Sequence, residues 1–157
     1  PEPLRNFRFA KDADKQGEAA GWAAVDFDDS AWQTTDVAVD TWSSIGLHAW
    51  FKSVWYRTEV KLPPVAPLNK NKKVCLWLGA TDGTAKVFVN GKPVPFVDAK
   101  GASHDEFNGY CQPASFDITD VAKPGAVNKI AILTTRTFFN ELGTGGLLAP
   151  AVVYREK

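Results

Sequence analysis

The chain has 157 residues, about the length of one domain, and folding at this size buries roughly 70% of the unfolded chain's surface without help from disulfides or metals. Its 18 Lys and Arg residues are balanced by 18 Asp and Glu residues, so it lacks the charge excess that neutralises phosphates or anionic lipids. These figures exclude nucleic acid and membrane surfaces as expected partners.

The first residues, Pro1-Glu2-Pro3, and the lack of methionine suggest a processed protein or a module of a longer one. No apolar run reaches the roughly 18 residues of a membrane-spanning helix. No signal peptide is visible, although an earlier segment could have carried one. We expect an extracellular or periplasmic location.

Apolar and polar residues alternate along most of the chain, a period of two that is typical of β-strands. The pattern predicts strands around Phe7 and Phe9 and at 55–62, 74–78, 85–89, 129–134 and 147–154. The stretch FDDSAW is the exception, because Asp28, Asp29 or Ser30 can cap a single helical turn that ends by Trp32. Short strands divided by Gly, Pro and Asn, without helices between them, predict an all-β fold, an antiparallel β-sandwich rather than a parallel α/β sheet.

The stretch VFVNGKPV at 87–94 predicts a β-hairpin in the middle of the chain. Asn90-Gly91 lies between alternating hydrophobic residues, and both residues tolerate the positive φ that a two-residue hairpin turn requires. We expect this hairpin to build the fold and to touch no ligand.

Two stretches, 74–78 and 129–134, are apolar at nearly every residue, as expected of central strands that are covered on both faces. Loops of the chain or a neighbouring domain must supply the second cover. No internal repeat or low-complexity linker divides the sequence, so we interpret residues 1–157 as a single domain.

Cys75 and Cys111 are the only cysteines, too few for a disulfide framework or a zinc site. Cys75 lies in a strand-like run and is expected to be a buried apolar residue. A disulfide between the two is the less expected alternative, and neither cysteine has the sequence signature of a nucleophile.

Five blocks of the sequence resemble a known domain in the order in which that domain has them. They are GWAAVDFDDSAW (21–32), WYRTEVKLP (55–63), LWLGATDGTAKVFVNGKPV (76–94), FDITDVAKPGAVNKIAI (116–132) and GGLLAPAVVY (145–154). Together they resemble the jelly-roll sugar-binding domain of glycoside hydrolase family 2. That domain has the galactose-binding-like fold, which many carbohydrate-binding modules share.

The resemblance implies a β-sandwich module of a larger glycosidase or polysaccharide-degrading protein, whose catalytic acids lie in a separate barrel domain. The residues agree that catalysis is not expected here. No pair of carboxylates stands out as a glycosidase acid and nucleophile, and neither His48 nor His104 lies near a G-x-S-x-G nucleophile elbow. Arg57, at a strand start, is expected to pair with a carboxylate such as Asp82 or Asp117.

Three loops carry the mixture of flat aromatic and polar side chains that sugar-binding sites use. The candidate ligand-binding residues are His48, Trp50 and Phe51 in the first loop, His104, Asp105, Glu106, Asn108 and Tyr110 in the second, and Arg136, Phe138 and Asn140 in the third.

Each candidate also has a purely structural interpretation. Tryptophans such as Trp77 are expected to pack in the core or at its edge more often than to stack on a ligand. Residues 104–106 suit a solvated loop equally well, and Arg136 suits an ion pair with Glu141 or Glu106. Phe138-Phe139 breaks the strand alternation, so one ring faces a ligand or a neighbouring domain.

No cofactor is required, but a structural calcium ion is an alternative that the sequence leaves open. KDAD (11–14) and FDD (27–29) supply oxygen ligands of the kind that calcium takes, although no D-x-D-x-D-G spacing is present.

Two functions follow from different classes. In the first, the chain is a non-catalytic carbohydrate-binding module that holds an oligo- or polysaccharide near a catalytic glycosidase domain and raises its effective concentration there. In the second, it is an interaction domain that packs on the catalytic barrel and binds no sugar alone.

Overall fold

A computed structural model describes residues 3–65, 71–137 and 145–156. The strands are β1 (Asn6–Asp12), β2 (Gln33–Asp36), β3 (Ser53–Lys61), β4 (Val74–Val89), β5 (Lys92–Val94), β6 (Phe96–Val97), β7 (Ser103–His104), β8 (Phe107–Asp117), β9 (Val127–Thr135), β10 (Gly146–Leu147) and β11 (Ala151–Arg155). All strand pairs are antiparallel, which confirms the predicted all-β sandwich. No membrane-spanning helix was found in a search of the described residues.

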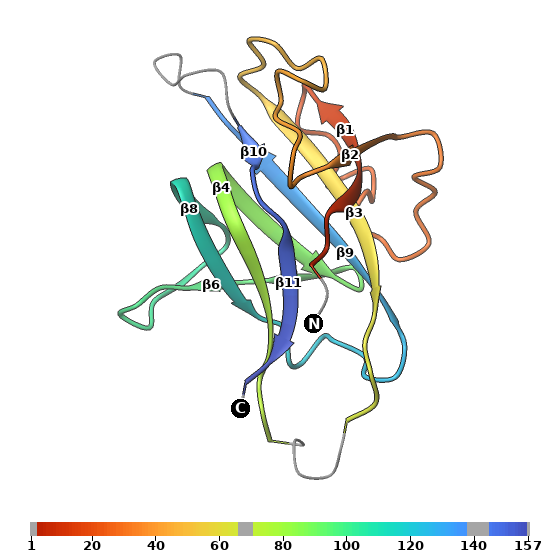
Figure 1. Ribbon diagram of the computed structural model, residues 1–157, viewed down its shortest axis with the longest axis vertical. Coiled ribbons are helices and arrows are strands. Elements are labelled where there is room, and N and C mark those ends of the chain that lie inside the picture. The colour runs from red at the N-terminus through yellow and green to blue at the C-terminus, as the bar shows by residue number, and fades with distance from the viewer. Residues whose placement is uncertain (1–2, 66–70, 138–144, 157) are drawn as a thin grey trace.

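Strand β4 belongs to both layers of the sandwich (Figure 1). Its first half pairs with β11 on one edge and with β8 on the other, and its second half pairs with β9 in the layer that continues through β3 and β1 to β2. The sequence pattern predicted two strands here, at 74–78 and 85–89. They are one strand of 16 residues, because register shifts between Leu78 and Gly83 bend it without ending the pairing.

Gly83 makes this bend possible. Its φ is 98°, and a Cβ at this position would lie 2.3 Å from the carbonyl oxygen of Thr135 on β9. Only glycine combines the positive φ with so close a backbone approach.

The main core lies between the two layers and is built from the inward-facing residues of both, among them Phe7, Tyr56, Leu76, Phe116 and Ile132. A second cluster forms on the outer face of β3, β4 and β9, where Trp55, Phe88 and Ala131 are covered by Trp22 and Trp32. The rings of Trp55 and Phe88 stack with centroids 5.5 Å apart. The second cover predicted for strand 129–134 is therefore provided by the chain's own segment 13–32.

Of the other local predictions, one is confirmed and two are corrected by the structure. The Asn90-Gly91 turn is confirmed, with φ values of 52° and 79° and Val89 paired with Lys92 across a two-residue loop. The predicted helical turn at Asp28 is a non-helical turn, in which Asp28 Oδ1 accepts a hydrogen bond from the Ser30 amide at 2.9 Å. Stretch 147–154 contains Pro150, which lacks an amide donor, and it divides there into β10 and β11.

The two cysteines are not bonded to each other. Cys75 is buried in β4 and Cys111 is exposed on β8, so the expected buried thiol is confirmed and the disulfide does not form. Burial raises the pKa of the Cys75 thiol, which keeps it protonated and unreactive.

Candidate functional site

One end of the sandwich brings together residues from all three predicted loops. Thr84 on β4 pairs with Thr135 of β9 on one side and with Asn108 of β8 on the other. Segment 43–52 joins them, because the Arg136 amide donates a hydrogen bond to the Lys52 carbonyl at 3.2 Å. We call this region the loop end, defined by residues 43–52, 81–84, 108–112 and 135–137.

A buried ion pair lies at the centre of the loop end. Arg136 Nη1 is 3.3 Å from Asp82 Oδ2, and the two side chains are 1% and 0% exposed. The guanidinium carbon of Arg136 is also 5.9 Å from the centre of the Phe51 ring. A cation this deeply buried fixes Phe51 and the bend of β4 in place instead of presenting its charge at the surface.

This pair corrects one prediction from the sequence. Arg57 was expected to pair with a carboxylate such as Asp82 or Asp117, but its Nε is 2.8 Å from Asp29 Oδ2. Arg57 lies on the same face of β3 as Trp55, where the 13–32 segment packs, whereas Asp82 lies at the bend of β4 beside Arg136. The alternation of residues in the sequence predicts on which face of a strand a side chain lies. It does not predict which loop covers that face.

The first predicted loop presents few free ring faces. Trp50 is half-buried against the core, its Nε1 donates to the Ser53 carbonyl at 3.1 Å, and the Lys11 ammonium lies 4.9 Å from its ring centre. Phe51 is half-buried beside Arg136, and His48 is exposed. Of the aromatic residues in this loop, Phe51 is therefore the one that lies next to the ion pair at the loop end.

The second predicted loop is divided between two places. Asn108 and Tyr110 are exposed on β8 at the loop end, and the Tyr110 side chain is among the most exposed large hydrophobic ones at 59%. His104, Asp105 and Glu106 are exposed where the β6–β7 hairpin leads into β8, and Figure 1 shows this hairpin projecting sideways from the sandwich.

Within that hairpin, His104 Nε2 is 3.0 Å from Asp98 Oδ2, and this contact is the main reason that the pKa of Asp98 lies below its usual value. Two backbone amides, from Lys100 and Ala102, also donate to Asp98 Oδ1. His104 thus has a structural role in closing the hairpin. In the third loop, Phe138 and Asn140 lie outside the described residues, as do Phe139 and Glu141.

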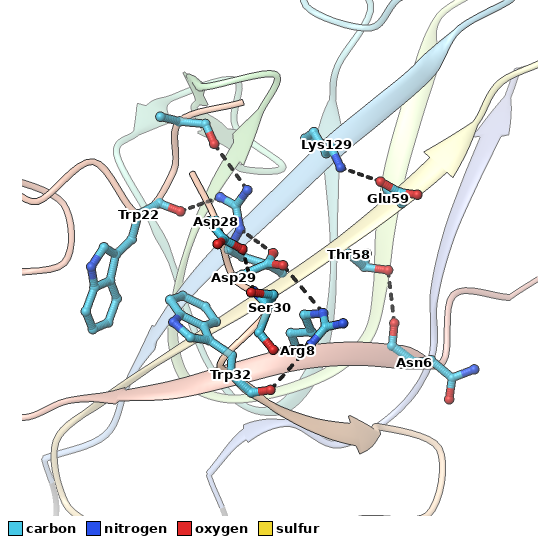
Figure 2. A network of polar contacts seen from close by, with 12 residues as sticks. Asn6, Arg8, Trp22, Asp28, Asp29, Ser30, Trp32, Thr58, Glu59 and Lys129 are labelled. Carbon is cyan, nitrogen blue, oxygen red and sulfur yellow. Dashed lines mark hydrogen bonds and ion pairs between the residues drawn. The ribbon is translucent and has the colours of Figure 1, made fainter. Parts of the chain in front are cut away.

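A second group of polar side chains surrounds a shallow cavity of about 290 Å³ on the outer face of β1, β3 and β9 (Figure 2). Arg57 is 3% exposed and donates to Asp29, to the Trp22 carbonyl and to the Ala24 carbonyl. Arg8 Nη1 donates to the Ser30 carbonyl at 3.1 Å, and its Nε is 3.4 Å from Asp29.

The charged and polar side chains around this cavity pair with other groups of the same protein. The Lys129 ammonium pairs with Glu59, and Thr58 Oγ1 donates to the Asn6 carbonyl at 2.9 Å. The network therefore fastens the 13–32 segment to the sheet, and it explains the cluster of acids in FDD without a ligand.

Three of the carboxylates that suggested a calcium ion have hydrogen-bond partners within the protein. Asp12 accepts hydrogen bonds from the Gln16 amide at 2.8 Å, the Gly17 amide at 3.0 Å and Trp55 Nε1 at 2.8 Å. Asp28 caps its turn and Asp29 binds Arg57. Throughout the described part of the chain, no three His, Cys, Asp or Glu side chains are grouped so that they could hold a metal ion.

No protein-family model and no curated protein sequence matches the chain. The chain does match solved structures. A Bacteroides uniformis β-glucuronidase aligns with 98% of this chain at 21% identity and a TM-score of 0.72, and a Ruminococcus gnavus β-glucuronidase in complex with C6-substituted uronic isofagomine aligns with 97% at 22% identity and a TM-score of 0.73.

The chain spans only 17% and 28% of the lengths of these two structures. At this level of identity the likeness concerns the fold, and it agrees with the β-sandwich that the sequence resemblance implied. The chain therefore has the antiparallel β-sandwich fold of a segment found within β-glucuronidases.

Proposed function

We propose that the chain is a non-catalytic β-sandwich module of a larger glycoside hydrolase and that it binds carbohydrate through its loop end. The observation that carries the proposal is the fit of nearly the whole chain to a minor part of two β-glucuronidases. In this proposal the catalytic domain of the same protein is the module's partner, and the module keeps the glycan near it.

The chemistry of the loop end supports carbohydrate as the ligand. A pyranose presents hydroxyl groups around its ring and C–H groups on its face, so its sites combine aromatic rings with polar side chains. Tyr110 supplies an exposed ring, and Asn108 supplies an amide that can both donate and accept. The Asp82–Arg136 pair and Phe51 give these groups a rigid base.

The test is isothermal titration calorimetry of the 157-residue chain with glucuronic acid, its β-glycosides and neutral oligosaccharides. We expect saturable binding to at least one of them and an affinity at least tenfold lower in Tyr110→Ala, the loss expected for about 1.4 kcal/mol. Val127→Ala is the matched control, because Val127 is also exposed but lies at the opposite end of β9 from Thr135.

Two results would contradict the proposal. Absence of heat with every sugar would favour a domain that only packs against the rest of its protein. If the affinity of Tyr110→Ala for the sugar fell no more than that of Val127→Ala, the binding site would lie elsewhere on the molecule. We expect EDTA to leave the affinity unchanged, because the carboxylates that suggested calcium are bound within the protein.

A further inference from the structure

The outer face of the layer formed by β11, β4 and β8 is a second surface with the properties of a binding site. Val152, Trp77 and Ser115 form one row across these three strands, and Tyr154, Cys75 and Asp117 form the next. Figure 1 shows the three strands side by side at the front of the molecule. We call this surface the outer face.

Trp77 is the residue that distinguishes the outer face. All six tryptophans lie in the described part of the chain, and Trp77 is the one that is exposed, at 38%. Its ring extends along β4 above Gly79, since ring carbon Cζ3 lies 3.2 Å from the point where a Cβ of Gly79 would be. The Pro150 carbonyl oxygen and the Ala149 Cβ approach the same point, at 2.8 and 2.9 Å, so the indole packs beside residues 149–150 and keeps part of its surface toward solvent.

Tyr154 places a second ring on the same surface. It pairs with Cys75, yet its hydroxyl oxygen is 3.5 Å from Ser115 Oγ, on the far side of β4. The phenol therefore reaches across the strand above the buried Cys75 thiol and ends beside the row that contains Trp77. Two hydroxyl groups thus lie on the Ser115 side of Trp77, and the partly exposed Asp117–Lys73 ion pair, at 3.2 Å, lies in the row that contains Cys75.

The exposed side chains and the open surface of the outer face decide what it can bind. Trp77 supplies an exposed ring, and Tyr154 and Ser115 supply hydroxyl groups, which together are the combination of aromatic and polar groups that sugar-binding sites use. A sheet face is open, so it contacts a sugar from one side and does not enclose it as a pocket does. An extended glycan suits it, because several sugar rings in a row can each contribute a contact from one side.

We propose that the outer face binds an extended polysaccharide, with Trp77 stacked on the C–H face of one pyranose ring and the hydroxyls of Tyr154 and Ser115 bonded to its neighbours. This site lies outside the loop end and goes beyond the function proposed above. It would hold the polymer chain, while the loop end would hold a short oligosaccharide or a chain terminus.

The test is affinity electrophoresis of the 157-residue chain through gels that contain soluble cellulose derivative, mixed-linkage β-glucan, xylan, galactomannan or pectin. We expect retardation in at least one gel, with the dissociation constant raised about tenfold in Trp77→Ala and less in Trp77→Phe, which keeps a ring. The same polysaccharide should protect the exposed indole from quenching by acrylamide. Thermal melting confirms that each variant is folded, and Val127→Ala is the control.

Three outcomes would overturn the inference. They are the absence of retardation in every gel, unchanged retardation of Trp77→Ala, and dimerisation that depends on Trp77, which would assign the outer face to a second copy of the chain. Tyr110→Ala separates the two sites. It should weaken the binding of short sugars but leave retardation by the polysaccharide unchanged. The experiment can therefore contradict one of the two proposed sites while it supports the other.

Discussion

At the scale of single residues, Arg57 is the side chain that ties the 13–32 segment to the sheet. Replacing it with Ala leaves the Trp22 and Ala24 carbonyls and Asp29 without their common donor. Because Arg57 is buried while Asp29 is partly exposed, we expect a loss of about 2–4 kcal/mol in the free energy of unfolding, measured with urea.

The matched control for Arg57 is Arg5, which forms an ion pair with Asp36 at the surface. Arg5→Ala should leave the urea midpoint unchanged within error, because exposed pairs contribute little. Equal midpoints for the two variants would show that the buried clamp does not hold the segment in place.

The Asp98–His104 pair gives a second residue-scale prediction, for pH dependence. The folded-state pKa of Asp98 lies below its unfolded value, so its contribution to stability is complete above about pH 4 and is lost as the pH falls through the lowered value. We expect His104→Ala to raise the pKa of Asp98 toward its usual value, because the His104 contact is the main cause of the shift.

NMR titration of the Asp98 carboxyl carbon checks this expectation. His48→Ala is the control, because His48 is equally exposed but lies in a different loop. An unchanged Asp98 pKa in His104→Ala would assign the shift to the backbone amides of Lys100 and Ala102 instead.

At the scale of elements, the β4–β5 turn does more than reverse the chain. The Asn90 side chain donates to the Val121 carbonyl and to Asn128 Oδ1, both at 2.8 Å, and accepts from the Lys129 amide at 3.0 Å. Asn90→Gly keeps the turn conformation but removes these bonds, so we expect a loss of about 2 kcal/mol by urea unfolding.

Gly91→Ala is the complementary variant for the same turn. Its φ is 79° and a Cβ would meet nothing closer than 3.7 Å, so only backbone strain of about 1 kcal/mol is expected. If Asn90→Gly proves less destabilising than Gly91→Ala, turn geometry rather than the side-chain bonds stabilises this element.

The same elements show how far sequence reasoning reaches. The hairpin, the sandwich and the strands at 55–62, 85–89 and 129–134 followed from periodicity and turn chemistry, because these depend on neighbouring residues. Strand β8 was predicted in part as a loop, and β2 was not predicted. The continuity of β4, the cover provided by Trp22 and Trp32, and the partners of Arg57 did not follow. They depend on contacts between residues far apart in the sequence, which no local pattern encodes.

The candidate site shows the same division. Composition identified Phe51, Tyr110 and Arg136 as loop residues with suitable chemistry, and the structure brings them to one end. Burial of Arg136 against Asp82 was not predicted, because the expected partners of Arg136 were Glu141 and Glu106. Trp77 was expected to pack in the core or at its edge, and it lies on the outer face with 38% of its surface exposed.

At the scale of the whole molecule, two surfaces with different shapes lie on one rigid sandwich. The loop end contains an exposed ring, an amide and a buried ion pair, and the outer face is an open sheet surface that carries Trp77. In the function that we propose, the two surfaces hold a polymer at two points, so that a catalytic domain of the same protein meets it at high effective concentration.

The most direct test of this account is a glycan array probed with the 157-residue chain, followed by analysis of the bound glycans for cleavage. We expect retention on at least one class of glycan without hydrolysis, and loss of retention in the double variant Tyr110→Ala/Trp77→Ala. A blank array, or retention that the double variant keeps in full, would contradict carbohydrate binding by these surfaces.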